Sequence, residues 1–105
     1  MTDKMIVLTT CGSIEEARSI ASALVERQLA ACVNIVPQVE SIYRWKGQVE
    51  AGSECLLLIK TTEGAFEHLR NAIRELHSYE VPEFIAIHIE DGSAAYLKWI
   101  EDSVK

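Results

Sequence analysis

Six side chains of this sequence have the chemistry of metal ligands: Cys11, Cys32, Cys55, His68, His77 and His88. Thiolates and imidazoles are the ligands that zinc and copper prefer in proteins. No two of the six stand at the close spacings, such as CxxC, HxxxH or HExxH, that mark the common zinc sites. The spacing alone therefore predicts no local zinc centre.

Each of these residues also has an ordinary structural role. Cys11 falls between the first predicted strand and the first predicted helix, where we expect a solvent-facing loop. Cys32 and Cys55 lie in apolar strands and are expected to be small buried residues. His77 ends a predicted helix, where the helix dipole favours a cation. His88 is expected on the sheet face away from the helices, where it would meet a neighbouring subunit.

The sequence shows no pattern typical of an enzyme. It contains no phosphate-binding glycine loop of the Walker or GxGxxG type, and no serine or cysteine nucleophile motif with a defined base. Four carboxylates surround the last predicted strand without a fixed partner: Glu80, Glu83, Glu90 and Asp91. We therefore predict a protein without catalytic activity.

Composition limits the class of protein further. The chain has 105 residues, 49% of them hydrophobic, with 10 basic against 16 acidic residues and a formal charge of −6. This length predicts one domain over residues 1–105, and the negative charge argues against nucleic acid as a partner. No apolar run approaches the ~20 residues that cross a bilayer, so we expect no membrane span. The start of the chain does not resemble a signal peptide, so we expect a cytoplasmic location.

The first half of the chain must position the candidate residues on strands. Met5–Leu8 is a short apolar run, typical of a buried strand. A helix is predicted to follow, because Ser13 and Glu16 stand in the spacing of a capping box. Apolar residues then repeat along one face of that helix: Ala17, Ile20, Ala21, Leu24 and Val25.

The centre of the chain predicts a long hairpin. Its strands are Ala31–Trp45 and Val49–Thr62, and Lys46 and Gly47 form the turn between them. Pro37 cannot donate a ladder hydrogen bond, so it marks a bulge or an edge position rather than a strand end.

This turn sets the predicted register. With Lys46 and Gly47 as the turn residues, Cys55 lies opposite Gln38, and Cys32 lies opposite Thr61. Cys32 and Cys55 are therefore not expected to face each other.

The second half of the chain repeats the order of the first. A second amphipathic helix is predicted over about residues 63–77, then a connector over 78–83, a strand over Phe84–Glu90 and a last helix after Ser93. The order predicts an α+β, ferredoxin-like βαββαβ sandwich with a C-terminal helix. Right-handed crossovers place both main helices on one face of the sheet and leave apolar groups uncovered on the other.

The length of the hairpin predicts an oligomer. A strand over Ala31–Trp45 extends almost ~50 Å, whereas a sphere with the radius of gyration of such a domain is only about 34 Å across. The tip carries the apolar residues Ile42, Tyr43, Trp45 and Val49, which a partner subunit would cover. The alternative is a hairpin that bends at Pro37 or at residues 51–53 and folds back on a monomer.

Two stretches of this sequence resemble the CutA divalent-cation-tolerance family: Leu29–Pro37 continuing through Ser41–Gly47, and His77–Glu83 leading to Tyr96–Ile100. With Ile59–Thr62, the resemblance covers nearly the whole chain. It implies a ferredoxin-like homotrimer, similar to the PII signalling proteins, in which long hairpins pair between subunits. It also implies a link to tolerance of copper and other divalent metals.

The resemblance also implies a ligand-binding cleft between subunits. The residues that would line it are Tyr43, Trp45, Lys60, His77, Tyr79, Glu83 and Trp99. Where copper-binding relatives place a cysteine and a second histidine, this sequence has Thr9 and Leu76, so only His77 of that set is present. Cys11 or His88 of a neighbouring subunit would have to complete a metal site.

Two functions remain open at this point. The first is a non-enzymatic trimer for divalent-metal homeostasis, which binds Cu²⁺ or another divalent cation, without an obligatory cofactor, or a small ligand in its clefts. The second is a PII-like sensor or adaptor that binds a small anionic ligand and signals to a protein partner. Lys60 and Arg44 favour the second function, because both side chains suit carboxylate or phosphate.

Overall fold

The computed structural model describes all 105 residues. Its elements follow the predicted order: β1 (Lys4–Cys11), α1 (Ile14–Glu26), β2 (Cys32–Trp45), β3 (Gln48–Thr62), the 3-10 turn η1 (Glu63–Ala65), α2 (Phe66–Leu76), β4 (Ile85–His88) and α3 (Ala94–Ser103). The α+β, ferredoxin-like arrangement with a long central hairpin and a C-terminal helix is confirmed. No helix is long and apolar enough to cross a membrane.

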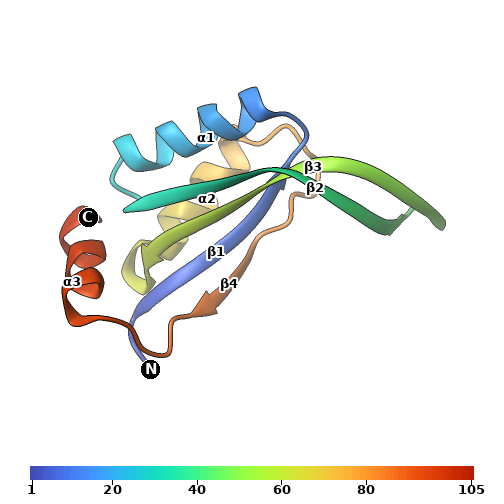
Figure 1. Ribbon diagram of the computed structural model, residues 1–105. Helices are drawn as coiled ribbons and strands as arrows, with labels where there is room; N and C mark the ends of the chain where they lie inside the picture. Colours follow the sequence, from blue (N-terminus) through green and yellow to red (C-terminus); the bar gives the residue numbers. More distant parts are fainter.

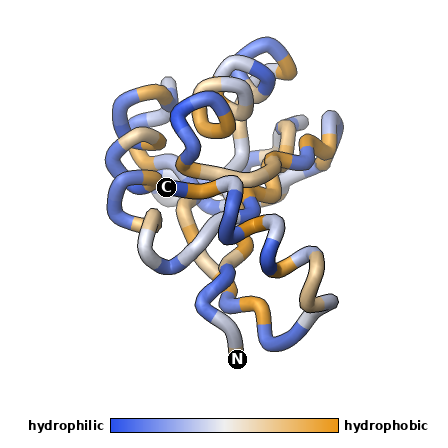
Figure 2. The backbone as a smooth tube through the Cα atoms, turned by 90° about the vertical axis from the view of Figure 1, so that its left-hand side faces the viewer, coloured by the Kyte–Doolittle hydropathy of each residue, from blue (hydrophilic) through white to orange (hydrophobic).

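The four strands form one antiparallel sheet in the order β2-β3-β1-β4. The helices α1 and α2 cover one face of it (Figure 1). Strand residues alternate between this face and the opposite one, since buried positions alternate with partly buried ones along β1 and β3. Hydrophobic and hydrophilic segments are both present along the backbone in Figure 2. The core therefore lies between helices and sheet, and its fully buried side chains include Val7, Ile20, Leu24, Leu57, Ile59, Leu69 and Ile73.

The first helix begins as its sequence predicts, with one difference. The Ser13 hydroxyl accepts a hydrogen bond from the backbone N–H of Glu16 at 3.1 Å. The Glu16 carboxylate does not turn back to complete the capping box with Ser13, because it accepts the backbone N–H of Ser78 at 2.8 Å instead. The long-range hydrogen bond from Ser78 therefore takes the place of one of the two hydrogen bonds of the capping box.

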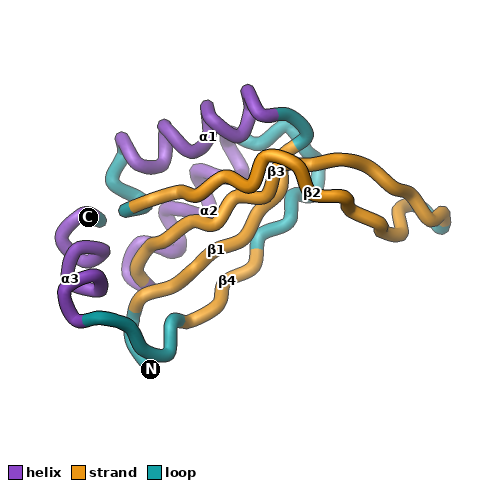
Figure 3. The backbone as a smooth tube through the Cα atoms, viewed as in Figure 1, coloured by secondary structure: helices purple, strands orange, loops and turns teal.

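The hairpin is continuous and projects from the rest of the subunit (Figure 3). The molecule measures 44 × 25 × 22 Å, with the hairpin along its long axis. Neither Pro37 nor residues 51–53 bend it back, so the folded-back alternative is wrong. At the tip, 71% of Ile42 and 66% of Val49 remain exposed.

A bulge at Pro37 shifts the register of the hairpin. Past the bulge, Cys32 lies opposite Lys60, one position away from the predicted Thr61. Cys32 is also only partly buried, contrary to prediction, because this register places it on the face away from α1 and α2. Pro37 and Gln38 together lie across from Cys55, since the ladder pairs the residues on either side of them.

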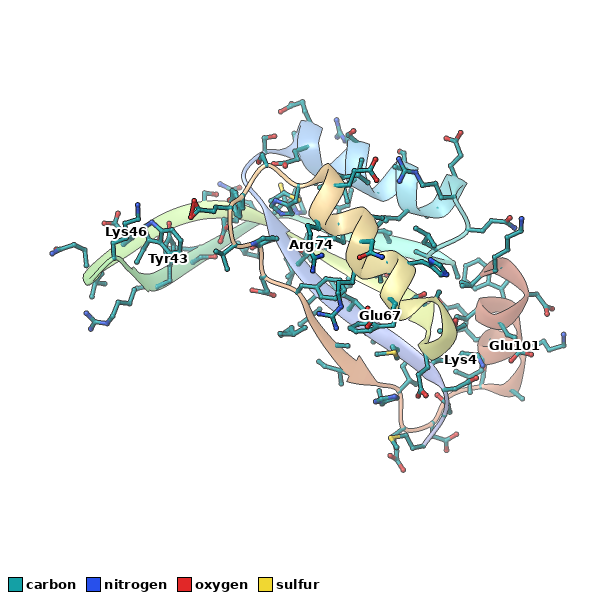
Figure 4. All side chains as sticks on the ribbon, turned by 180° about the vertical axis from the view of Figure 1, so that it is seen from behind. Lys4, Tyr43, Lys46, Glu67, Arg74 and Glu101 are labelled. Carbon is teal, nitrogen blue, oxygen red and sulfur yellow. The ribbon has the colours of Figure 1, made fainter.

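The last helix closes the end of the sheet that lies away from the hairpin tip (Figure 1). The Ser93 hydroxyl caps α3 by accepting the N–H of Tyr96 at 3.1 Å. Lys4 of β1 points toward Glu101 of α3 (Figure 4), and its ammonium group lies 3.1 Å from that carboxylate. Between α3 and the hairpin, the sheet face stays uncovered, with Ile85 and Ile87 about half exposed.

Candidate functional site

Four of the predicted cleft residues line one groove along the projecting hairpin. Tyr43 and Trp45 come from β2, while Tyr79 and Glu83 come from the connector between α2 and β4. The groove has a volume of about 810 Å³. The structure therefore brings these residues of the hairpin and of the connector after His77 together in one groove.

Two further predicted cleft residues, Lys60 and Trp99, lie together at a different place. The Lys60 ammonium group is 3.1 Å from the Tyr96 hydroxyl and 5.4 Å from the centre of its ring. The Tyr96 and Trp99 ring centres are 5.4 Å apart. Since Tyr96 and Trp99 belong to α3, this cluster lies at the end of the sheet away from the hairpin tip (Figure 1). Within one subunit, the predicted cleft consists of two separate clusters.

The groove is acidic as well as aromatic. Four carboxylates line it, Glu40, Glu54, Glu80 and Glu83, and no lysine or arginine does. Carboxylates beside aromatic rings favour a cation over an anion. Sequence reasoning missed Glu40 and Glu54, although both lie in the polar half of the hairpin that leads to the tip.

Tyr79 joins the connector to the hairpin across this groove. Its hydroxyl donates a hydrogen bond to the Glu54 carboxylate at 2.8 Å. Burial, and then this bond to Glu54, raise the pKa of Tyr79 well above its ordinary value. The ring also lies against Gly12, where a Cβ atom would approach the Tyr79 hydroxyl to 3.3 Å. A larger residue at position 12 would therefore displace Tyr79.

The side chain of His77 is fully buried beside the groove. Its Nε2 lies 2.6 Å from the carbonyl oxygen of Thr10, and its Nδ1 accepts the backbone N–H of Tyr79 at 3.0 Å. A carbonyl only accepts and a backbone N–H only donates, so the ring is neutral with its proton on Nε2. His77 could bind a metal only by giving up one of these bonds.

Glu16 completes this cluster from the first turn of α1. Besides accepting from Ser78, its carboxylate lies 3.8 Å from Nδ1 of His77. Partial burial by itself raises the pKa of Glu16, but hydrogen bonds from Ser78 outweigh burial and lower the pKa below its ordinary value. The carboxylate is therefore ionised at neutral pH.

Cys11 does not lie in a solvent-facing loop, because β1 continues through Thr9 and Thr10 to include it. It is fully buried, and burial, followed by the charges of Glu16, Cys55 and Glu54, raises its pKa to about 12. Cys11 lies directly opposite Cys55 of β3. The prediction for Cys55 is confirmed, since only 3% of it is exposed.

His88 lies on the opposite sheet face from the one predicted. Phe84, four residues earlier, points to the same side of the strand as His88. It packs against Phe66 of α2, with ring centres 5.2 Å apart, so this side of β4 faces the helices. The His88 Nε2 contacts the Glu63 carboxylate at 2.9 Å. The exposed face carries Ile85 and Ile87 instead. The sequence pattern of β4 gave no reason to choose between the two faces, since both are apolar.

The three predicted metal ligands do not meet within one subunit. His88 pairs with Met5, six residues along β1 from Cys11, which places the two about 20 Å apart. No group of three or more His, Cys, Asp or Glu side chains has the arrangement of a metal site. Thr9, where copper-binding relatives would place a cysteine, has a buried hydroxyl without a hydrogen-bond partner. One subunit alone therefore does not fit a copper(II) site of that kind.

Comparison with known sequences relates this chain to one protein family. The family model described as CutA1 divalent ion tolerance protein matches residues 5–103. The chain is 52% identical to the divalent-cation tolerance protein CutA of Thermus thermophilus over 93% of this chain and 95% of that protein. It is 47% identical to human protein CutA over 87% of this chain. The chain spans about half the length of the human protein, 51%, so that protein has further residues with no counterpart in this match.

Solved structures agree with the sequence comparison. The divalent cation tolerance protein from T. thermophilus superposes with a TM-score of 0.95 and 50% identity, over 97% of this chain and 99% of that one. CutA from Xylella fastidiosa gives a TM-score of 0.96 at 36% identity, over 99% and 100% of the two chains. The names of two relatives refer to different cellular compartments: one is a chloroplastic protein of Arabidopsis thaliana and the other a periplasmic protein of Archaeoglobus fulgidus. With its fold and nearly its whole length matched, this chain belongs to the CutA divalent-cation-tolerance family.

Proposed function

We propose that this protein is a non-catalytic homotrimer that acts in tolerance of divalent metal ions, copper among them. Its subunits would bind a metal ion or a small ligand in the clefts between them. The observation that carries this proposal is the acidic, aromatic groove beside a hairpin that its own subunit leaves uncovered. A cytoplasmic location remains a prediction of the sequence.

Two uncovered surfaces support the trimer. The hairpin tip exposes Trp45 and Ile42, and the open sheet face exposes Ile85 and Ile87. A monomer would leave both apolar surfaces in water, whereas a closed oligomer covers both at once. Two clusters that lie apart in one subunit, around Tyr79 and around Lys60, could then line one cleft from two subunits.

Sedimentation equilibrium tests the trimer. We expect the mass of three chains at micromolar concentration. Replacing Ile42 at the tip by Asp should favour smaller species, because it would bury an unpaired charge in the interface. Arg18→Asp, on the exposed side of α1, is the matched control and should leave the mass unchanged. A folded wild-type monomer would contradict the proposal.

Isothermal titration with copper(II) tests the metal function. We expect saturable binding by the wild-type protein, because the groove concentrates carboxylates. Glu83→Gln removes one groove charge, and His77→Ala tests whether the buried imidazole becomes a ligand. His68→Ala, an exposed position of α2, is the control. The absence of specific uptake by the wild-type protein would remove the metal part of the proposal.

The Lys60 cluster favours a second candidate function, a PII-like sensor of a small ligand without a physiological metal role. Lys60 is a cation beside the two aromatic rings of Tyr96 and Trp99, which suits an anion with an apolar part. A thermal-shift screen of small carboxylates and phosphates separates the two functions, since a ligand raises the melting midpoint by mass action. A shift that Lys60→Ala abolishes would favour the sensor.

A further inference from the structure

Cys11 and Cys55 form a buried pair of thiols at the point where β1 and β3 meet the base of the hairpin. The two residues are register partners in adjacent antiparallel strands. Both face α1 and α2, and neither is exposed by more than 3%. The third cysteine, Cys32, lies on the opposite face of the sheet. The groove around Tyr43 and Glu83 does not include either thiol of the pair.

The alternation of hydrogen-bonded and non-hydrogen-bonded residue pairs between β1 and β3 indicates how far apart Cys11 and Cys55 lie. The N–H of Glu63 donates to the carbonyl of Asp3, and the register between β1 and β3 runs from there to Cys11 and Cys55 without a break. Hydrogen-bonded pairs recur every second residue, so Cys11 and Cys55 are such a pair, with Cα atoms about 5.5 Å apart. On the other side of β1, the N–H of Ile89 donates to the carbonyl of Lys4. Even-numbered residues of β1 therefore bond toward β4, which agrees with odd-numbered residues such as Cys11 bonding toward β3.

This spacing suits a bridged pair of sulfurs better than a disulfide. Opposed Cβ atoms in hydrogen-bonded pairs lie near the wide end of the 4.5 to 5.5 Å range, about 5.5 Å apart. A disulfide needs about 3.5 to 4.5 Å between them. A metal ion held linearly between two sulfurs, with bonds near the ~2.3 Å length of Zn–S bonds, would separate the sulfurs by about 4.6 Å.

We propose that Cys11 and Cys55 form a two-thiolate site for a soft monovalent cation such as Cu⁺ or Ag⁺. Thiolate sulfur is the donor that selects Cu(I) over the harder divalent ions. Binding would form two sulfur–metal bonds and release both thiol protons to solvent, with no change in oxidation state. Because Cys11 and Cys55 lie opposite each other at one ladder position, two-coordinate binding would need no third ligand from the chain.

The surroundings favour the thiol form of Cys11 when no metal is bound. The Cys55 thiol donates to the carbonyl oxygen of Pro37 at 3.2 Å, in the bulge of β2. Rotation of Cys55 about its first side-chain torsion would turn the sulfur from Pro37 toward Cys11. Burial and the nearby negative charges of Glu16 and Glu54 disfavour a free thiolate at Cys11. The same charges stabilise a bound cation, so protons and a soft cation compete for the site.

This site is independent of the divalent function proposed above. Its two ligands are neither groove carboxylates nor His77, and it requires only one subunit. Either proposal can therefore fail while the other stands.

An anaerobic competition experiment tests the site. Reduced protein is titrated into the coloured complex of Cu⁺ with bicinchoninate, and loss of colour reports transfer of Cu⁺ to the protein. We expect the wild-type protein to remove about one Cu⁺ per chain. Cys11→Ala and Cys55→Ala should each abolish this transfer, whereas Cys32→Ala, the matched control, should retain it.

Three results would overturn the proposal: no transfer to the wild-type protein, transfer that survives in Cys11→Ala or Cys55→Ala, or loss of transfer in Cys32→Ala. Titration of thiols in denaturant, before loading, should find all three cysteines reduced. A finding of only one thiol would show that the pair is a disulfide and would also contradict the proposal. Circular dichroism of each variant shows that loss of binding is not loss of fold. If Cys55→Ala does not fold, Cys55→Val replaces it, because Val fills the buried volume without a sulfur.

Discussion

The Nε2 of His77 lies 2.6 Å from the carbonyl oxygen of Thr10, across 67 residues of sequence. Alternate residues of β1 direct their backbone groups toward β4, as Lys4 does when its carbonyl accepts from Ile89. The pairing with β4 ends at Leu8 and Ile85, so β4 supplies no partner for Thr10. His77 takes that place, and its Nδ1 orders the connector by accepting from Tyr79. The imidazole is therefore a structural link between the end of the sheet and one wall of the groove.

His77→Ala should destabilise the protein by about 1–3 kcal/mol, because it leaves buried backbone groups of Thr10 and Tyr79 without partners. Guanidinium unfolding at fixed protein concentration measures the change. His68→Ala, on the exposed side of the same helix, should stay within about 0.5 kcal/mol of the wild type. Equal stability of His77→Ala and wild type would show that water replaces both bonds without cost.

Glu16→Gln should destabilise the protein at neutral pH but not in acid. The pKa of Glu16 is lowered in the folded protein, so its carboxylate stabilises the fold above the unfolded pKa of about 4.3. That contribution disappears as pH falls through the lower folded pKa. The difference in unfolding free energy between wild type and Glu16→Gln should therefore narrow below about pH 4. Glu15→Gln, its exposed neighbour, is the control, and a gap that did not change with pH would contradict the prediction.

Tyr79 should ionise at more alkaline pH than an ordinary tyrosine, because burial and the bond to Glu54 raise its pKa. A raised pKa favours the neutral phenol in the folded state, so this contribution to stability is lost as pH rises above about 10. Phenolate absorbance measures the titration. Tyr79→Phe should remove the late step, whereas Tyr43→Phe should retain it. A late step that persists in Tyr79→Phe would assign it to another residue.

Gly47→Ala should destabilise the hairpin by about 1 kcal/mol. Both turn residues have positive φ, 50° at Lys46 and 80° at Gly47, which only glycine adopts without a steric penalty. Gly52→Ala is the matched control, because Gly52 lies in the same hairpin, has no positive φ, and a Cβ there would have only the Tyr43 hydroxyl nearby, at 4.0 Å. The thermal midpoint at fixed concentration reports both variants. A drop for Gly52→Ala as large as that for Gly47→Ala would show that the turn conformation is not the cause.

The sequence by itself determined the elements and their order. Apolar periodicity marks α1 and α2, Ser13 marks the start of a helix, and Lys46 with Gly47 marks the hairpin turn. These signals are local, because each depends on residues within one or two turns of backbone. The length of the hairpin alone predicted that it overhangs its subunit. The family resemblance named four residues that the structure places in the groove: Tyr43, Trp45, Tyr79 and Glu83.

Only the tertiary structure decided which distant residues meet. The sequence could not show that the bulge at Pro37 shifts the register by one residue, and a shift of one residue changes every partner beyond it. It could not show that β1 extends to Cys11, because the pairing with Cys55 that extends the strand is a long-range contact. For the same reason His88 was assigned to the wrong face, since packing of Phe84 against Phe66 selects the face that α2 covers. Local patterns fix where strands and helices form, whereas pairing energies between segments fix their register, their faces and hence the site.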